Sequence, residues 1–359
     1  MGRYRIAVIA GDGIGPEVVT EALKVLEALP GDDLALEPEA VEAGARCYRR
    51  TGEELPRETF DACQAADAIL FGSAGLPDVR LPDGTEIAPQ LALRVRLDLY
   101  VGLRPIKLYP GVVSRLRLDE GERIDYVLVR ENTEGLYASR GGGVRVGSHV
   151  AIDTLVVTRA GAARICRQAF ELARRRGGAP LDGQRRVTCV DKANVLKSFA
   201  FFREVFDEVA GDYPEVEAGH AYIDAIAAYL VQAPSRYDVL VAENMFGDIL
   251  SDLAAATVGG LGLAPSGDIG EHHGLFQPSH GTAPDIAGKG IANPLATILS
   301  AGLMLDWLGR RHGDEPALVA ARRIEAAVAS VLRAGRVLTP DLGGAATTAA
   351  VGDAVVASL

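Results

Sequence analysis

The sequence has few cysteines and no long hydrophobic run. Its 359 residues include four cysteines, none in a CxxC spacing: Cys47, Cys63, Cys166 and Cys189. This scatter argues against a zinc site or a disulfide framework and fits a reducing cytosol, so we expect a cytoplasmic protein. No stretch approaches the roughly 20 apolar residues of a transmembrane helix, and the N-terminal segment lacks the apolar core of a signal peptide.

Positive charge is also scarce. Lys and Arg number 37 against 48 Asp and Glu, which gives a net charge of −11. An acidic chain repels nucleic acid and anionic lipid, so we expect neither as a partner. Hydrophobic residues make up 48% and charged residues 24%, as is typical of globular proteins. The length predicts two domains or one large unit with two lobes.

Short apolar runs alternate with segments of helical periodicity. Continuous apolar runs are typical of strands that are covered on both faces. Such runs occur at 6–9, 68–71, 126–129, 187–190 and 239–241. Helices are predicted after Pro16, from near Asn194, and over 88–99, 159–176, 246–257, 294–309, 316–333 and 345–358. This alternation predicts an α/β fold with a largely parallel sheet.

Three glycine-rich segments interrupt the pattern. GDGIGPE (11–17) is spaced GxGxG rather than as a dinucleotide fingerprint, and Glu17 puts negative charge where pyrophosphate would bind. We interpret it as a tight turn into a helix. The segment 259–293 is rich in Gly and Pro and long enough to indicate a functional loop. The basic segment 139–149 is interpreted as a protruding arm.

Two acids in FGDILSDL are candidate metal ligands. Asp248 and Asp252 are four residues apart and therefore share one helix face. Like charges at this spacing repel by a few tenths of a kcal/mol, and a divalent cation would reverse that cost. Carboxylate oxygens suit Mg²⁺ or Mn²⁺. The alternative is that Asp248 caps the helix and Asp252 is solvated. Asp224, in an apolar segment, is by itself typical of a surface acid.

Three arginines are candidates for binding an anionic substrate. Arg94 and Arg104 flank a helix-to-strand passage, and Arg130 ends the apolar run YVLVR. Guanidinium groups bind carboxylates in a bidentate manner, so three of them converging would indicate a substrate with more than one carboxylate. The alternative for each is a surface ion pair.

Tyr137 and Lys192 are a possible acid and base. Tyr137 ends RENTEGLY, and Lys192 follows a predicted strand in VDKANVL. Nearby cations would have to lower their pKa values for them to exchange protons near neutral pH. The alternative is a packed aromatic and an exposed lysine. The sequence contains no GxSxG elbow and no P-loop.

Eight segments together resemble the β-decarboxylating dehydrogenases, the isocitrate and 3-isopropylmalate dehydrogenase family. They run nearly end to end: GDGIGPE, LDLYVGLRP, RENTEGLY, VDKANVL, ENMFGDILSDL, GGLGLAPSGDIG, HGTAPDIAGKGIANP and TPDLGG. The resemblance implies a two-domain fold with a mixed, largely parallel sheet that binds its nucleotide without a Rossmann site. It implies a discontinuous large domain, 1–99 with 256–359, around a small domain, 100–255. The arm at 139–157 would join a dimer interface.

The resemblance also implies roles for the candidate residues. Substrate carboxylates would be held by Arg94, Arg104 and Arg130, and Tyr137 would protonate the carbon left after decarboxylation. Lys192 and Asp224 would come from one subunit into the other's site, where Asp224 completes the metal ligands Asp248 and Asp252. The implied enzyme is an obligate homodimer that oxidatively decarboxylates a 2-hydroxy-3-carboxy acid with Mg²⁺ or Mn²⁺.

The segment HGTAPDIAGKGIANP resembles the family's adenosine loop. Asp285, followed by Ile286, stands where NADP-using relatives carry a basic residue and a tyrosine. A carboxylate accepts hydrogen bonds from both ribose hydroxyls and repels a 2′-phosphate, so we predict NAD. The other predicted cofactor-binding residues are His280, Gly281, Thr282, Ala283 and Asn293.

The substrate's side group depends on the segment just before Arg94. Isopropylmalate enzymes have a Glu where this chain has Ile87, and paired leucines that here correspond to Gln90 and Leu91. Isocitrate enzymes have Ser and Asn where this chain has Ala88 and Gln90. We predict 3-isopropylmalate or a close 3-substituted malate, on family frequency. Homoisocitrate, isocitrate, tartrate and D-malate are alternatives, and two of the segments, RENTEGLY and GGLGLAPSGDIG, look closer to the homoisocitrate and tartrate branches.

Two other classes of protein remain as hypotheses. One is a non-catalytic regulatory subunit of the same family, and the other is a metal-dependent hydrolase or lyase that uses the aspartate pair without a nucleotide. The intact set of matched positions argues against the first.

Overall fold

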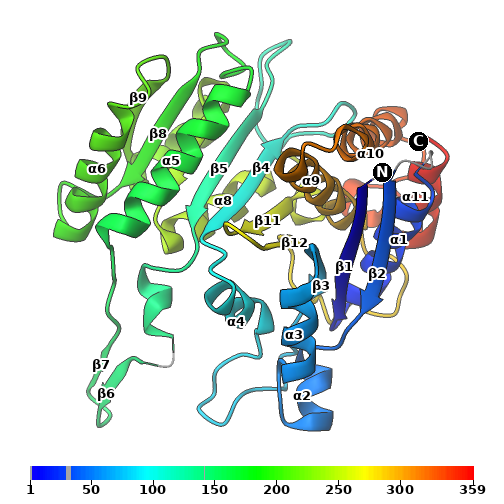
Figure 1. The fold of residues 1–359 in the computed structure, drawn as a ribbon. Helices are drawn as coiled ribbons and strands as arrows, with labels where there is room; N and C mark the ends of the chain where they lie inside the picture. Colours follow the sequence, from blue (N-terminus) through cyan, green and yellow to red (C-terminus); the bar gives the residue numbers. More distant parts are fainter. Residues whose placement is uncertain (1, 30–33, 141) are drawn as a thin grey trace. The chain divides into compact units, whose positions relative to one another are not determined.

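The computed structural model describes residues 2–29, 34–140 and 142–359 (Figure 1). The chain divides into two compact units. The terminal unit comprises Met1–Leu99, Tyr109–Val113 and Gly259–Leu359, and the central unit comprises Tyr100–Leu108 and Ser114–Val258. The terminal unit is therefore built from both ends of the chain.

Five strands of the terminal unit lie in the order β2-β1-β3-β12-β11. Their bounds are Gly2–Gly11 (β1), Leu34–Ala40 (β2), Ala68–Ser73 (β3), Pro265–Ile269 (β11) and Gly274–Pro278 (β12). All neighbours in this series are parallel except β11 and β12, which form an antiparallel hairpin.

Helices cover both faces of these strands. They are α1 (Gly15–Glu27), α2 (Ala45–Thr51), α3 (Arg57–Ala65), α4 (Pro89–Arg96), α9 (Leu295–His312), α10 (Glu315–Ala334) and α11 (Thr348–Val356). Successive residues of a strand point to opposite faces, and β1 follows this rule. Ile6 and Val8 pack in the core formed with α1, α9 and α10, whereas Ala7 and Ile9 pack with Phe60 of α3.

The strands of the central unit lie in the order β4-β5-β10-β8-β9. Their bounds are Val101–Lys107 (β4), Asp125–Glu131 (β5), Arg186–Asp191 (β8), Glu217–Tyr222 (β9) and Val239–Ala242 (β10). Among the described pairings of this five-strand series, only that of β4 with β5 is antiparallel. The helices are α5 (Arg159–Arg175), α6 (Lys197–Ala210), α7 (Ile223–Gln232) and α8 (Asn244–Thr257). Tyr126 and Leu128 pack with Leu250 of α8, and Val127 and Val129, which alternate with them along β5, are also buried, so both faces are covered.

The predicted α/β class with a mixed, largely parallel sheet is confirmed. The two strands of the 259–293 segment, β11 and β12, were not predicted, because PSGDI and GLFQP have neither a β-branched run nor alternation. The helix predicted over 88–99 ends at Arg96, and Asp98 takes a positive φ of 48°. Among the described helices, none is long and apolar enough to cross a membrane.

The predicted arm is a small antiparallel ribbon. Its strands are β6 (Val144–Val146) and β7 (Val150–Ile152), and every residue of both is exposed. Four of the six are Val or Ile. An isolated two-stranded ribbon with apolar side chains in water is at best marginally stable, so this surface is suited to being covered by another one.

Candidate functional site

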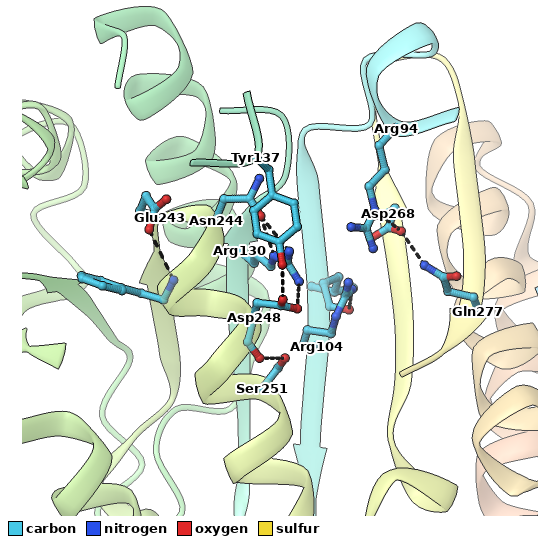
Figure 2. A network of polar contacts seen from close by, with 12 residues as sticks. Arg94, Arg104, Arg130, Tyr137, Glu243, Asn244, Asp248, Ser251, Asp268 and Gln277 are labelled. Carbon is cyan, nitrogen blue, oxygen red and sulfur yellow. Dashed lines mark hydrogen bonds and ion pairs between the residues drawn. The ribbon is translucent and has the colours of Figure 1, made fainter. Parts of the chain in front are cut away.

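The strongest polar cluster of the central unit forms around Asp248 on α8 (Figure 2). The Tyr137 hydroxyl donates a hydrogen bond to Asp248 Oδ2 at 2.5 Å, and Arg130 forms an ion pair with Asp248 Oδ1 through Nη1. Arg130 also donates from Nε and Nη2 to Asn244 Oδ1, at 3.0 and 2.7 Å. Arg130 is 3% exposed, so this charge is held almost entirely by protein partners.

Strand topology brings these residues together. Arg130 lies near the carboxyl end of β5, directly opposite Ala242 at the end of the parallel strand β10, after which α8 begins. Carboxyl ends of parallel strands share one edge of a sheet, where ligands of α/β proteins bind. Gly247 lets the two elements meet closely, since a Cβ there would lie 2.7 Å from Arg130 Cβ.

The Tyr137 hydroxyl is protonated and is held by its hydrogen bond to Asp248. Partial burial raises its pKa, and the hydrogen bond to the Asp248 carboxylate raises it further, while the positive charge of Arg130 opposes both. The hydroxyl therefore stays protonated near neutral pH. Arg130 supplies a cation near Tyr137, with its guanidinium carbon 5.3 Å from the tyrosine ring centre. The pKa of Tyr137 is nevertheless raised on balance, so the lowering that the sequence-based hypothesis required is not seen.

Asp252 lies one helical turn after Asp248. Although Asp252 is exposed as a residue, protein atoms partly desolvate its carboxylate, which raises its pKa, and the negative charge of Asp248 raises it further. The positive charges of Arg104 and Arg130 act in the opposite direction. The interpretation of Asp248 as a helix cap is wrong: Glu243 is the N-cap of α8 and accepts from Phe246 N at 3.3 Å.

These acids fit a divalent cation only in part. Two carboxylates on successive turns supply hard oxygen ligands, and a cation would relieve their repulsion. Within the described residues, however, no three His, Cys, Asp or Glu side chains are grouped closely enough to hold a metal ion. Asp224 is instead ion-paired with Lys192, and that hydrogen bond lowers the pKa of the exposed Asp224 carboxyl.

Arg94 and Arg104 are both buried, in different units. In the terminal unit, Arg94 Nε donates to Asp268 Oδ2 at 2.9 Å, and Gln277 Nε2 donates to the same oxygen at 2.8 Å (Figure 2). In the central unit, Arg104 on β4 donates from Nη1 to the carbonyl of Leu103 at 3.1 Å. The alternative that these arginines form surface ion pairs is therefore wrong for both.

The first turn of α4 holds the predicted specificity residues. Gln90 and Leu91 precede Arg94 by four and three positions and so share its helix face. Gln90 Oε1 is buried and has no hydrogen-bond partner among the described residues. Ile87, just before the helix, is fully buried and packs with Ala45 and Val79, so it belongs to the core of the terminal unit.

The predicted nucleotide loop is anchored to the glycine turn at 11–17. Ile14 N donates to Thr282 O at 2.9 Å, and the Glu17 carboxylate accepts from Gly288 N and Gly290 N at 2.5 and 3.2 Å. Asn293 Nδ2 donates to Asp341 Oδ2 at 3.0 Å. Glu17, which argued against a pyrophosphate site, thus has a structural role in the loop.

The acid and the imidazole of this loop differ in environment. Asp285 is exposed, and no hydrogen bond or ion pair joins it to another described residue. Burial lowers the pKa of His280, so its ring is neutral near pH 7. His280 Nδ1 lies 2.9 Å from Gly281 O, while Nε2 is buried without a partner in the described part of the chain. The flanking Ala283 takes a φ of 38°, and Ile286 packs on the cluster of Ile14 and Val18.

Three residues of these networks were not predicted: Asn244, Asp268 and Gln277. Asn244 lies one helical turn before Asp248, so the same spacing that links Asp248 and Asp252 could have identified it. Asp268 and Gln277 lie on β11 and β12, in a segment without periodicity. Asp268 bonds Arg94 across 174 residues of sequence, and no local pattern carries that information.

Comparison with known proteins gives similarities over nearly the whole chain. The sequence profile described as isocitrate/isopropylmalate dehydrogenase matches residues 5–355. The 3-isopropylmalate/3-methylmalate dehydrogenase of Methanocaldococcus jannaschii is 48% identical over 344 residues, covering 95% of this chain and 94% of that protein. The 3-isopropylmalate dehydrogenase of Corynebacterium efficiens is 48% identical over 361 residues, 99% of each chain.

Solved structures agree with these sequence similarities. The isocitrate dehydrogenase of Methylococcus capsulatus superposes with a TM-score of 0.86 at 39% identity, over 99% of both chains. A β-decarboxylating dehydrogenase from Thermococcus kodakarensis, solved in its apo form, gives a TM-score of 0.79 at 41% identity, over 99% of this chain and 96% of that one.

Proposed function

Because the chain belongs to the isocitrate/isopropylmalate dehydrogenase family and is thus a decarboxylating dehydrogenase, we propose that it oxidises and decarboxylates 3-isopropylmalate or a close 3-substituted malate. The observation that carries this proposal is the convergence of Tyr137 and Arg130 on Asp248. A proton donor, a cation for a carboxylate and an acid that can bind a metal ion are three of the groups that this reaction requires.

The substrate assignment rests on the face of α4 that carries Arg94. One turn before Arg94 this face offers an amide, Gln90, and an apolar side chain, Leu91, but no second cation. A third carboxylate placed against Leu91 would lose hydration without gaining a charged partner, which is costly. An apolar side group on the substrate has no such cost. This favours a 3-alkyl malate over isocitrate or homoisocitrate.

The family uses a nicotinamide dinucleotide and a divalent metal ion. For this chain we propose NAD, held by the 280–293 loop with Asp285 toward the ribose, and Mg²⁺ or Mn²⁺ held by Asp248, Asp252 and Asp224. When bound, the metal ion acts as a Lewis acid toward the substrate's oxygens and NAD accepts the hydride.

The chain's own residues then bind the substrate and move protons. Arg94, Arg104 and Arg130 bind the carboxylates, which fixes the orientation of the reacting carbon. Lys192 assists removal of the proton of the 2-hydroxyl through a relay. After the carboxylate on the neighbouring carbon leaves as CO₂, Tyr137 donates its proton to that carbon.

We propose that the enzyme is a homodimer in which Lys192 and Asp224 serve the partner's site. Exposed apolar side chains near these two residues support self-association: Val195, Leu196, Tyr229, Val231 and, on α8, Ile249. The ribbon of β6 and β7 supplies a second apolar surface.

The substrate is tested with purified protein, NAD, Mg²⁺ and a panel of acids, with NADH formation as the measurement. We expect the highest kcat/KM for 3-isopropylmalate, lower values for D-malate, tartrate, isocitrate and homoisocitrate, and no NADH once EDTA removes the metal. A preference for a tricarboxylate would contradict the assignment from α4. If no acid is turned over but calorimetry shows NAD binding, the result would indicate a regulatory subunit. If NAD does not bind either, the result would indicate a hydrolase or lyase.

The nucleotide preference is tested by Asp285→Lys. Replacing the exposed carboxylate by a cation should shift the ratio of kcat/KM for NADP over NAD upward by at least roughly tenfold, because a 2′-phosphate then gains a charged partner. The control is Glu271→Lys, which makes the same change of charge at an exposed site outside the loop. An unchanged ratio in Asp285→Lys, or an equal shift in Glu271→Lys, would refute a ribose contact.

A further inference from the structure

Arg203 of α6 connects the ends of two neighbouring strands of the central unit. Its Nε and Nη2 donate to Oδ2 and Oδ1 of Asp191, each at 2.8 Å. Its guanidinium carbon also lies 5.1 Å from the ring centre of Tyr222. Asp191 is the last residue of β8, Tyr222 is the last residue of β9, and the two are partners in the parallel ladder. One guanidinium therefore fixes both strand ends.

Burial and two hydrogen bonds hold the Asp191 carboxylate in one orientation against Arg203. Asp191 is fully buried, and an unpaired carboxylate there would be costly by several kcal/mol. Two parallel hydrogen bonds from Arg203 fix the orientation of the carboxylate as well as its charge. Asp191 Oδ1 also accepts from Ala193 N at 2.8 Å. The backbone is thus held on both sides of the residue between them, Lys192.

Lys192 and Asp224 follow directly from these fixed ends. Lys192 comes immediately after Asp191, Asp224 comes two residues after Tyr222, and the two side chains form an ion pair. We propose that Arg203 is a positioning residue that sets the placement of Lys192 and Asp224 for the reaction. This inference rests on the proposed function, in which both residues act in chemistry, and it assigns Arg203 no contact with substrate or nucleotide.

The same unit contains a matched control pair. Arg176 Nε donates to Asp238 Oδ1 at 2.8 Å, and Asp238 is also fully buried. The arginine side chains are 20% exposed at Arg176 and 25% exposed at Arg203. Asp238, however, precedes the first residue of β10, at the opposite end of the parallel strands. Arg176 also donates from Nη2 to the carbonyl and carboxylate of Asp125, at 2.9 and 2.8 Å. Losing Arg176 should therefore cost at least as much stability as losing Arg203, but only Arg203 is next to Lys192.

The test compares R203Q, R203K and R176Q with the wild type in the full-length enzyme. It measures kcat and KM for 3-isopropylmalate, the isotope effect on kcat with 2-deuterated substrate, and the thermal midpoint. Misplaced reacting groups can cost as much as roughly 100-fold in rate, so we expect R203Q to lower kcat between about 10- and 100-fold. The isotope effect should rise as chemistry becomes more rate-limiting, while KM for NAD should stay within about twofold.

The controls separate positioning from folding. R203K should regain part of the lost kcat, because lysine restores the charge but not the two-point geometry. R176Q should lower the thermal midpoint at least as much as R203Q does, yet keep wild-type kcat and isotope effect per folded protein. Wild-type kcat and isotope effect in R203Q, or equal losses in R176Q, would overturn the inference. A wild type without activity on any acid would overturn the proposed function, and this inference with it.

Discussion

Replacing Asp248 with asparagine is expected to lower kcat at saturating Mg²⁺ by at least roughly 100-fold, because a metal ligand supplies several kcal/mol of transition-state stabilisation. The change should also raise the Mg²⁺ concentration needed for half-maximal rate. Asparagine keeps one oxygen that can accept from Arg130, and Arg130 also keeps its bonds to Asn244, so the buried guanidinium retains partners and the fold should persist. Steady-state kinetics over a Mg²⁺ series measures both effects.

Asp306→Asn is the matched control for this change. Asp306 lies on α9, where both of its carboxylate oxygens accept from Arg310, at 2.7 and 2.9 Å. The substitution therefore also removes a helical carboxylate that pairs with an arginine, but at an exposed position of the terminal unit. Its kcat and Mg²⁺ dependence should match the wild type. A kcat for Asp248→Asn within a few-fold of that control would exclude Asp248 as a metal ligand.

Two inactive variants should restore each other if the active sites are shared. In a mixed dimer of Lys192→Met and Asp248→Asn, one site receives both substitutions and the other receives neither. Random pairing makes about half of the dimers mixed, each with one intact site of two, so the mixture should show about a quarter of wild-type activity per protomer. Coexpression with two different affinity tags isolates the mixed dimer for assay.

The control for this experiment pairs two substitutions from the same contributed surface. Lys192 and Asp224 are in direct contact, so they would enter the same partner site. A mixed dimer of Lys192→Met and Asp224→Asn then has one impaired residue in each site and should stay inactive. Recovery of activity in both mixtures would mean that Lys192 and Asp224 of one protomer enter different active sites. Recovery in neither mixture would indicate that each protomer uses its own Lys192 with its own Asp248.

Local patterns predicted much of the fold but few of its contacts. The strand β5 could be predicted because the run 126–129 is continuously apolar. The shared face of Asp248 and Asp252 on α8 could be predicted because residues four apart lie on one side of a helix. The hairpin of β11 and β12 could not, because burial of all but Ile269, rather than residue preference, makes PSGDI and GLFQP extended. The tertiary environment of these two segments, rather than the strand propensity of their residues, determines that they are strands.

The candidate site divides in the same way. Single arginines were more typical of surface ion pairs, yet Arg94, Arg104 and Arg130 are all buried. The family-specific segments implied a substrate-binding role for them but not their burial, because burial of a guanidinium depends on partners such as Asp268 and Asn244 that are distant in sequence. The contact of Glu17 with the 288–290 backbone was equally inaccessible, since it joins residues 271 positions apart.

Gly247 limits how this enzyme can be made more heat-resistant. Exchanging a glycine within a helix for alanine is a standard stabilising change, worth roughly 1 kcal/mol from helix preference alone. At this position the added methyl group would meet Arg130 at Cβ and Cγ, the least movable part of that side chain. Any gain in helix stability would therefore come with displacement of the Arg130 guanidinium. A substitution that favours the helix at this position would thus disturb the arginine that the proposed reaction uses.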